Sequence, residues 1–507
     1  MRRDLAVGLS LSTLWFVGAW SDLIPFLYIA DRFPIGALPC WNDFLAVVLN
    51  VLLAGAAFAA AAALARRGPA WLRRLSGWAL LASLAVPANA IRNHFDTWPE
   101  RLYAALGPAA GTLAAVCAAA ALAAVAIRWH RHVVRGVVAA LTIVFPLVPI
   151  TFAQAGWALS QAGGRMQCGG ASAAGGAVAG PAARRVLWIV YDELDQATAF
   201  DSRPAGLALP AFDALARESF AAANALPPGD RTERSMPAYL TGLRVADAVL
   251  VGRNQLRLEA GGRTFVWSGA DTIFARARRM RVNTGLAGFF LPYCAMIGDQ
   301  LTACDWQPCV TCGRLTGVFG TTLGESMWHQ ASELAPQYGR RRHAAAYRRL
   351  QEDGVALARD GSIGFAVIHL PVPHEPGIYD RARGRMAWLP PDGDGYVHNL
   401  ALADRSLAQL RTAVADAGLS DRTTLMVFGD HGRRDRGDGE AIADRRVPFL
   451  VRLAGDSRGA AHAAPLTPWP GSPAAPRSPC PRRTDRSSRG WIARCQPDRP
   501  SAPGRSP

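Results

Sequence analysis

Five stretches in the first third of the chain are each long and apolar enough to cross a lipid bilayer. They lie near residues 5–28, 44–65, 75–91, 104–127 and 133–154. A membrane-spanning helix needs roughly 20 mostly apolar residues. Asp22 interrupts the first stretch and Pro87 lies in the short third one, and helices in a bilayer tolerate both departures. Residues 1–155 are therefore predicted to form a transmembrane domain of five helices.

The charges of the loops predict the orientation of these helices. Arginines precede the first stretch and fill the second-to-third and fourth-to-fifth loops: Arg2, Arg3, Arg66, Arg67, Arg73, Arg74, Arg128, Arg131 and Arg135. The other two loops carry Asp31, Asp43, Asp96 and Glu100 instead. Because cytoplasmic loops are rich in Arg and Lys, we expect a cytoplasmic N-terminus and place everything after residue 155 outside. The alternative is a soluble protein with buried helices.

The basic composition does not indicate nucleic-acid binding. The formal net charge is +16, and every Lys or Arg position is an Arg. These arginines occur at membrane flanks, along surface helices and near the C-terminus. A nucleic-acid-binding domain gathers basic residues on one face with aromatic residues among them, so we expect no nucleic-acid partner.

Composition also predicts the domain boundaries. Residues 156–183 are rich in Gly and Ala and are expected to form a flexible linker. Residues 461–507 hold eleven prolines, a density that excludes helices and central strands. We therefore expect a disordered tail there, and we interpret it as a frameshift or a degraded end.

Between the linker and the tail, short apolar runs alternate with amphipathic segments. The strand-like runs are 186–191, 363–370 and 425–429, and the helix-like segments include 211–221 and 400–417. Continuous apolar runs of this length suit strands that are covered on both faces, as in a parallel sheet. Residues 184–460 are therefore predicted to form an α/β domain with a largely parallel central sheet.

Acidic residues or histidines lie at the end of each of the three predicted strands. They are Asp192 and Glu193 after the first, His369 and His374 at the second, and Asp430 and His431 after the third. In open α/β sheets, ligands bind outside the carboxyl ends of the strands. Carboxylate and imidazole groups suit Zn²⁺ or Mn²⁺, so a divalent cation site is predicted at this edge. The alternative is that the acids end a strand and meet water.

Two hydroxyl groups in the segment "GDRTERSMPAYLTG", Thr232 and Ser235, are candidate nucleophiles. A bound cation can lower the pKa of a hydroxyl group and neutralise charge on an attacked phosphoryl or sulfuryl group. The alternative is that either residue caps a helix that begins near Pro237, since Pro is favoured in the first turn. We favour catalysis for Thr232 and capping for Ser235.

Six segments occur in an order that resembles the sulfatase-like branch of the alkaline phosphatase superfamily. They are "VLWIVYDELD", "LPAFDALARESFAAANALPPGDRTERSMPAYLTG", "HLPVPHEPGIYD", "YVHNLALADRSLAQLR", "TTLMVFGDHG" and "RRVPFLVRLAG", which cover roughly residues 184–455. Five membrane helices before such a domain resemble the phosphoethanolamine transferases of bacterial envelopes and the lipoteichoic acid synthases. The resemblance implies a bacterial inner-membrane protein with a periplasmic catalytic domain.

The resemblance also implies roles for individual residues. Thr232 matches the nucleophile of the transferase pattern "T-x-x-S-x-P" and would also ligate the metal. The other metal ligands would be Asp192, Glu193, Asp430 and His431. His374 and His369 would bind the substrate, although His369 could face the core instead.

The implied reaction transfers a phosphoryl-linked head group from a membrane lipid to an envelope glycan, a lipid or water. Sulfatases that use formylglycine carry Cys or Ser, then x-Pro-x-Arg, whereas Tyr239 stands at the Arg position here. The transferases also have a His about a dozen residues past "DHG" that this chain lacks, so head-group recognition is not carried over. A sulfuric ester hydrolase and an inactive relative with a degraded C-terminus remain as alternatives.

Four cysteines, Cys294, Cys304, Cys309 and Cys312, lie close together in the sequence. Oxidation is favoured outside the cytoplasm, so one or two disulfides are expected. A zinc site built from four thiolates is the alternative. Cys117 lies in a predicted span and is expected to act as a small apolar residue.

Overall fold

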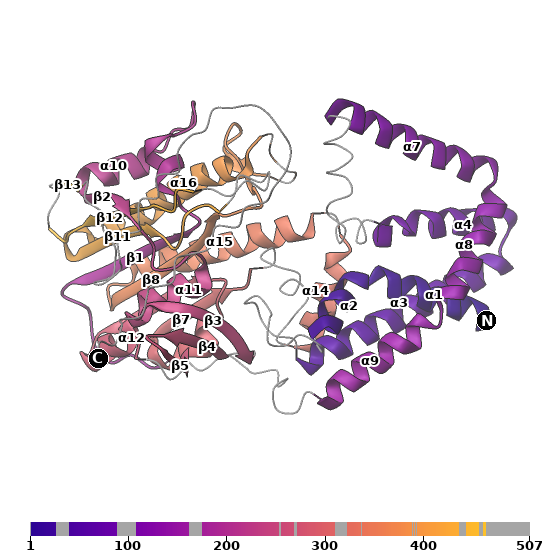
Figure 1. Cartoon of the computed structure of the whole chain (residues 1–507), viewed down its shortest axis with the longest axis horizontal. Coiled ribbons are helices and arrows are strands. Elements are labelled where there is room, and N and C mark those ends of the chain that lie inside the picture. Colours follow the sequence, from indigo (N-terminus) through magenta and orange to yellow (C-terminus); the bar gives the residue numbers. More distant parts are fainter. Residues whose placement is uncertain are drawn as a thin grey trace, which may run out of the picture. The chain divides into compact units, whose positions relative to one another are not determined.

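Figure 1 shows the computed structural model of the chain. It describes residues 2–26, 40–88, 108–161, 175–252, 255–267, 271–309, 322–335, 337–387, 389, 391, 393–434, 443–455 and 460–462. Almost all of the predicted tail and the middle of the predicted linker lie outside these residues. Cys312 also lies outside them.

The N-terminal part is helical, in agreement with its apolar composition. Its helices are α1 (Arg2–Trp15), α2 (Val17–Phe26), α3 (Trp41–Arg67), α4 (Ala70–Ser83), α7 (Pro108–Arg128), α8 (His130–Val144) and α9 (Leu147–Gln161). Helices α1 and α3 pack closely because glycines meet at their contact. A Cβ atom on Gly8 would lie 2.3 Å from the carbonyl oxygen of Gly55. The Ser12 hydroxyl group donates a 2.8 Å hydrogen bond to the Val51 carbonyl.

The described helices do not confirm five membrane spans. Two helical stretches are long and apolar enough to cross a bilayer by length and composition, Trp41–Arg67 and His130–Trp157. The first predicted span is divided at Phe16 into α1 and α2, and α4 ends at Ser83, before the predicted end of the third span. The N-terminal half of the fourth predicted span is only partly described.

The C-terminal part alternates strands and helices. Its main elements are β1 (Arg185–Asp192), α10 (Pro210–Glu218), β2 (Phe220–Ala225), α11 (Thr232–Thr241), α12 (Ile273–Arg279), β6 (Asn283–Phe289), α13 (Tyr293–Ile297), β7 (Ala303–Gln307), α14 (Leu323–Glu333), α15 (Tyr338–Arg359), β8 (Ile363–Pro373), α16 (Gly395–Asp416), β11 (Thr423–Gly429), β12 (Val447–Arg452) and β13 (Ala460–His462). A separate antiparallel sheet contains β3 (Val245–Gly252), β4 (Gln255–Ala260) and β5 (Arg263–Val266).

The central sheet is mixed and has the described order β13-β2-β12-β11-β1-β8-β6-β7. Strand β1 lies between β11 and β8 and is parallel to both, with Tyr191 opposite Gly429 and Val190 opposite His369. Strands β8, β6 and β7 are also parallel to one another, whereas β12 runs antiparallel to β11 and β2. The prediction of a largely parallel α/β sheet is therefore confirmed in its central strands, with an antiparallel strand at one side.

The three predicted strands are buried, as their continuous apolar sequences indicate. Every residue of β8 is buried, and α15 and α16 pack against it and against each other. The predicted helix 211–221 is too long, because α10 ends at Glu218 and Phe220 begins β2. The β2 sequence "FAAANA" lacks a strand-like pattern of β-branched residues, and its pairing with β12 stabilises it as a strand.

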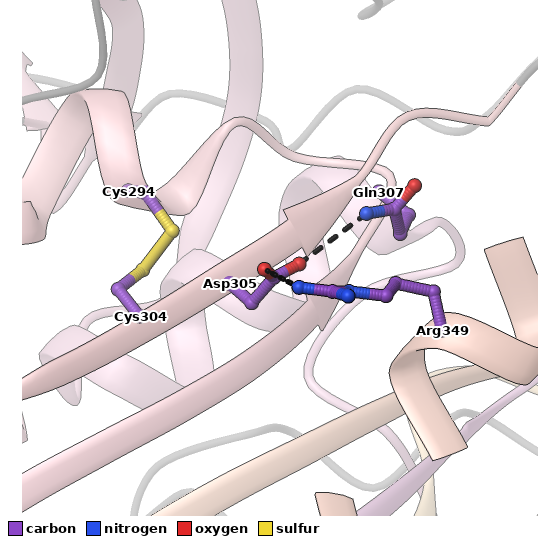
Figure 2. Close-up of a disulfide and its surroundings, with 5 residues drawn as sticks. All are labelled: Cys294, Cys304, Asp305, Gln307 and Arg349. Atoms are coloured by element: carbon purple, nitrogen blue, oxygen red, sulfur yellow. Dashed lines mark hydrogen bonds and ion pairs between the residues drawn. A yellow bond between two sulfur atoms is a disulfide. The ribbon is translucent and has the colours of Figure 1, made fainter. Parts of the chain in front are cut away.

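Two of the clustered cysteines form a disulfide. Cys294 of α13 is bonded to Cys304 of β7, and Figure 2 shows this bond beside Asp305, which Arg349 and Gln307 both contact. Cys309 and Cys40 are also disulfide-bonded. The expectation of one or two disulfides is therefore confirmed, and a zinc site built from all four thiolates is excluded because the sulfurs of Cys294, Cys304 and Cys309 are already bonded. Cys117 is a free, exposed thiol.

Candidate active site

The carboxyl ends of β1, β8 and β11 bring the predicted site residues together. Asp192 is the last residue of β1, and Asp430 directly follows β11. Backbone hydrogen bonds join these ends: the Asp430 N–H group donates to the Tyr191 carbonyl at 3.2 Å, and the His374 N–H group donates to the Asp192 carbonyl at 3.1 Å. The side chains at three strand ends are thereby fixed next to one another, as the sequence predicts.

Three buried side chains form a group that could hold a metal ion. One ligand atom from each of Asp192, Asp430 and His431 lies within 4.8 Å of the others. The Thr232 hydroxyl group completes this group, because its oxygen lies 2.6 Å from Asp430 Oδ2 and 3.5 Å from both Asp192 Oδ1 and His431 Nε2. All four side chains are buried. Four of the predicted site residues therefore converge on one point.

Thr232 lies at the start of helix α11, which fixes its position. It is the first residue of this helix, and no side chain of the preceding residue, Arg231, caps it. The N-terminus of a helix carries partial positive charge, which favours an anion or a developing alkoxide there. The helix begins five residues earlier than expected, so Ser235 lies inside the helix and is not its cap. The capping interpretation of Ser235 is therefore wrong.

The backbone holds Asp430 in one orientation. Its Oδ1 atom accepts hydrogen bonds from the N–H groups of Glu193, at 3.1 Å, and His431, at 2.7 Å. Glu193 has a φ angle of 64°, a left-handed conformation that is unfavourable for a residue with a side chain. This conformation turns the Glu193 N–H group toward Asp430 and leaves Oδ2 free to face Thr232.

His369 faces the same point from the side of β8. It is fully buried, and its Nδ1 atom lies 3.2 Å from the Tyr293 hydroxyl group. Its Nε2 atom has no hydrogen-bond partner among the described residues and lies 3.8 Å from Asp430 Oδ2. Burial lowers the pKa of His369 to about 4, so the ring is neutral at pH 7, as a metal-ligating imidazole must be.

Glu193, His374 and Arg434 form a second layer, nearer to solvent. Glu193 Oε1 accepts a 2.8 Å hydrogen bond from Arg434 Nε and lies 3.9 Å from His374 Nε2. The His374 ring also approaches the Arg434 guanidinium group, at 3.4 Å. The Glu193 carboxylate therefore lies against Arg434 and outside the three-residue group, although Glu193 was expected to be a metal ligand.

The electrostatics of the buried group favour a divalent cation. Burial and the neighbouring carboxylate of Asp430 raise the pKa of Asp192. Burial opposes ionisation of Asp430 too, but His431, His369 and the hydrogen bond from Thr232 bring its pKa below the usual value. Burial opposes protonation of His431, yet Asp430 and Asp192 raise its pKa. A divalent cation would relieve the repulsion between the carboxylates, and His369 Nε2 could act as a ligand to it. The residues present therefore fit such an ion.

Tyr239, which stands where formylglycine sulfatases have an arginine, has a structural role here. Its ring packs against Phe428, with centroids 4.9 Å apart, and its hydroxyl group donates to the Gly429 carbonyl at 3.4 Å. Tyr239 therefore braces helix α11 against the end of β11. It carries no positive charge that could take the place of an arginine.

Sequence reasoning missed Arg434 and Tyr293. Arg434 follows the "DHG" segment by two residues, and a basic residue so close to a predicted cation site was a usable signal. Tyr293 gave no local signal, because it lies 76 residues from His369, its hydrogen-bond partner. Tyr293 begins α13, which follows β6, and the pairing of β6 with β8 brings it near His369.

No family model and no curated protein matches the chain, whereas solved structures do. The PsFucS1 sulfatase from Pseudoalteromonas sp. aligns with a TM-score of 0.40 and 14% identity over 56% of this chain and 65% of that one. The phosphonate monoester hydrolase of Agrobacterium radiobacter aligns with a TM-score of 0.37 and 15% identity over 56% and 71%.

A third solved structure is a member of the alkaline phosphatase superfamily from Vibrio parahaemolyticus. It aligns with a TM-score of 0.36 and 14% identity over 58% of this chain and 64% of that one. The structural neighbours are thus sulfatases and members of the alkaline phosphatase superfamily. Because these TM-scores are 0.40 or lower, the similarity carries no argument about the activity of this chain.

Proposed function

We propose that this chain is a metal-dependent enzyme that attacks a phosphoryl ester through the hydroxyl group of Thr232. The observation that carries the proposal is the position of this hydroxyl, which lies within 3.5 Å of Asp192, Asp430 and His431 at the start of a helix. A buried threonine with only a structural role needs one hydrogen-bond partner, and a carbonyl group would suffice. Two carboxylates and an imidazole are the surroundings of a hydroxyl group that is to be activated.

The ligands of the cation would be Asp192, Asp430, His431 and Thr232, with His369 Nε2 as a further donor. Oxygen and imidazole donors suit Zn²⁺ or Mn²⁺. When bound, such an ion supplies Lewis-acid stabilisation of the attacked group and lowers the pKa of the nucleophile.

The remaining steps use the side chains of the chain. The Thr232 hydroxyl group donates to Asp430 Oδ2, with 2.6 Å between the two oxygens, so this carboxylate can accept the proton as the Thr232 oxygen bonds to phosphorus. The ester bond on the opposite side breaks, and the departing alcohol takes a proton from His374 or water. Water or an acceptor hydroxyl group then bonds to phosphorus and gives up its proton to His374 or water, and the Thr232 oxygen leaves with the proton that Asp430 held. Arg434 and His374 are placed to bind the oxygens of the transferred group.

We further propose that the substrate is a lipid head group on the outer side of a membrane. Two helical stretches are long enough to span a bilayer, and exposed tryptophans lie near both ends of this region. Trp71 and Trp129 lie beside the arginine-rich loops, whereas Trp41 and Trp157 lie at the opposite ends of these two stretches. Tryptophan is enriched at both membrane interfaces, which supports a multi-pass inner-membrane protein.

The disulfides support the same orientation. Cys40, at the end of α3 opposite to its arginines, is disulfide-bonded, as are Cys294, Cys304 and Cys309. Structural disulfides persist in oxidising compartments such as the periplasm. A phosphodiester donor in the membrane, and an envelope glycan or lipid as acceptor, fit an enzyme in this place.

The nucleophile favours phosphoryl over sulfuryl transfer. Formylglycine cannot form from Thr232, and the Ser235 hydroxyl group lies inside helix α11. The test is to incubate the full-length protein with Mn²⁺ or Zn²⁺ and either a nitrophenyl phosphodiester or a nitrophenyl sulfate, followed by mass spectrometry of the Thr232 peptide. We expect release of nitrophenol from the diester and a phosphoryl adduct on Thr232. Turnover of the sulfate alone, or of neither ester, would contradict the proposal.

A further inference from the structure

Helix α14 belongs by sequence to the C-terminal part, yet it packs against α3 of the N-terminal part. Four buried polar side chains make this contact: Asp43 and Asn50 of α3, and Ser326 and Gln330 of α14. The Ser326 hydroxyl group donates to Asp43 Oδ1 at 2.6 Å, and Gln330 Nε2 donates to the Asp43 carbonyl at 2.9 Å. We call these four residues the α3–α14 network.

Asn50 extends the network along α3. Its Nδ2 atom donates to Gln330 Oε1 and to the Met327 carbonyl, both at 3.1 Å. Gln330 therefore contacts both Asp43 and Asn50, which are two turns of helix apart. Buried polar groups without partners are costly. Asp43 Oδ2 accepts from the Cys40 N–H group at the start of α3, and α14 supplies partners for Asp43 Oδ1, the Asp43 carbonyl and Asn50. The contact is thus specified by matched donors and acceptors rather than by apolar area alone.

The depth of α14 follows from the length of α3. The 27 residues of α3 rise about 40 Å, whereas the hydrocarbon core of a bilayer is about 30 Å thick and takes up roughly 20 residues. If Arg66 and Arg67 lie among the inner head groups, the outer boundary falls near residue 46. Asp43 then lies in the outer interface, and Asn50 lies just inside the hydrocarbon. An asparagine at that depth needs a protein partner, so α14 must reach it.

The exposed face of α14 suits a lipid interface. Gly324, Trp328 and Ala331 are exposed and follow one another at the spacing of one helix face. The one charged residue beside this face is the exposed Glu325, whose carboxylate caps the start of the helix by accepting from the Thr322 N–H group. The large side chain of the face is Trp328, which is 70% exposed. Trp41, at the start of α3 and two residues from Asp43, is also exposed. Two exposed indoles at the same end of α3 match the aromatic belt of a membrane interface.

We propose that α14 is an interfacial helix, which holds the C-terminal part of the chain to the outer leaflet with its Trp328 face in contact with lipid. This inference rests on the membrane placement proposed above. It assigns α14 a lipid surface as its partner, and it gives the enzyme a second attachment to the membrane besides the chain connection through residues 162–184. An enzyme that acts on lipid head groups would gain from such an attachment, because it restricts the site to the plane of its substrate.

The test is site-directed spin labelling of the full-length protein in lipid nanodiscs. Cys117→Ser removes the free thiol found among the described residues, and cysteines are then introduced one at a time as Trp328→Cys, Ile143→Cys and Met280→Cys. The latter two are exposed residues of α8 and of the turn after α12, and they serve as lipid and water references. Labelling of the Cys117→Ser protein alone gives the background.

We expect the label at residue 328 to be more accessible to oxygen than to a polar nickel chelate, with a depth between the two references. The inference would be overturned if the label at residue 328 were as accessible to the nickel chelate as the label at residue 280, while the label at residue 143 remained lipid-exposed. This result would leave the membrane placement intact. Protection of residue 328 from both reagents would also overturn it, because protein would then cover this face. A water-exposed label at residue 143 would instead overturn the proposed membrane placement.

A second variant tests whether the α3–α14 network holds the helix in place. Gln330→Leu removes the side chain that bonds both Asp43 and Asn50, and it preserves the helix because Leu is a good helix former. We expect Gln330→Leu to make the label at residue 328 more accessible to the nickel chelate, so that its depth approaches that of the aqueous reference at residue 280. An unchanged label would show that the network does not anchor α14.

Discussion

The hydroxyl group of Thr232 donates a 2.6 Å hydrogen bond to Asp430, although 198 residues separate the two in the sequence. Helix α11 supplies one partner and the end of β11 supplies the other. Two backbone N–H groups fix Asp430 Oδ1, which leaves Oδ2 for the hydroxyl. The contact therefore joins a candidate nucleophile to a candidate base and metal ligand in one fixed geometry.

Replacement of Thr232 should abolish turnover without unfolding the protein. Thr232→Ala removes the nucleophile, and we expect kcat for a nitrophenyl phosphodiester to fall by roughly a thousandfold or more. Thr232→Ser keeps the hydroxyl group and should retain measurable activity. The matched control is Thr241→Ala in the same helix, where the buried hydroxyl group donates to the Pro237 carbonyl. This control should lower stability and leave kcat nearly unchanged, and an active Thr232→Ala enzyme would exclude the mechanism.

Removal of divalent metal should destabilise the protein. A ligand present at a hundred times its Kd stabilises the folded state by about 2.7 kcal/mol, so chelation should lower the thermal midpoint and Mn²⁺ or Zn²⁺ should restore it. Asp192→Asn should abolish this response, because it removes one ligand and much of the negative charge. Differential scanning fluorimetry of the purified full-length protein measures both effects. A metal response that persists in Asp192→Asn would place the ion elsewhere.

The two adjacent arginines after "DHG" should differ in their effects. Arg434 lies against Glu193 at the candidate site, whereas Arg433 is bonded to Asp394 and stacks on the Tyr396 ring at 4.3 Å. A hydrogen bond to a charged group contributes about 1.5–3 kcal/mol, so Arg434→Gln should raise KM by about tenfold to a hundredfold. Arg433→Gln should lower stability with little change in KM. Equal KM values for Arg434→Gln and the parent enzyme would remove Arg434 from substrate binding.

Stability should fall as the pH decreases from about 6.5 toward 3. Burial lowers the pKa of His343 to about 3, from an ordinary value of 6.5. In this interval the unfolded chain binds a proton that the folded chain cannot bind, so the free energy of unfolding decreases as the pH falls. Denaturant titrations at several pH values measure the slope, and His343→Phe should reduce it. An unaltered slope in this variant would show that His343 does not titrate in this way.

Loss of the Cys294–Cys304 disulfide should destabilise the C-terminal part. The bond closes a loop with a sequence separation of 10, for which the chain-entropy model gives about 3 kcal/mol. The double variant Cys294→Ser, Cys304→Ser should therefore unfold at lower denaturant concentration than the parent. Turnover below the transition should be unchanged, because neither cysteine belongs to the group of Asp192, Thr232, Asp430 and His431. An unchanged denaturation midpoint would contradict a stabilising role.

The strands that carry the site could be predicted from the sequence. The apolar runs before Asp192 and Asp430 could be assigned because a strand covered on both faces must be apolar throughout, and the convergence of their ends follows from parallel pairing. Strand β2 could not be assigned, because "FAAANA" is stabilised by its pairing partner and not by its own propensity.

The contacts around the site were harder to predict than the residues themselves. The pairing of Glu193 with Arg434 depends on the left-handed backbone of Glu193, for which a Glu gives no signal. The start of α11 at Thr232 was missed because Pro237 suggested a first turn, whereas Pro237 lies inside the helix. The α3–α14 network joins residues about 280 apart in sequence, and no local pattern connects them.

The most direct test of the account is anomalous diffraction from crystals of the full-length protein grown with Mn²⁺ or Zn²⁺. We predict a single strong peak within about 2.0–2.3 Å of atoms from Asp192, Asp430 and His431, with the Thr232 oxygen within reach of the same ion. The proposal that these four side chains form a metal-dependent active site would be contradicted by a peak elsewhere, or by no peak among them at saturating metal.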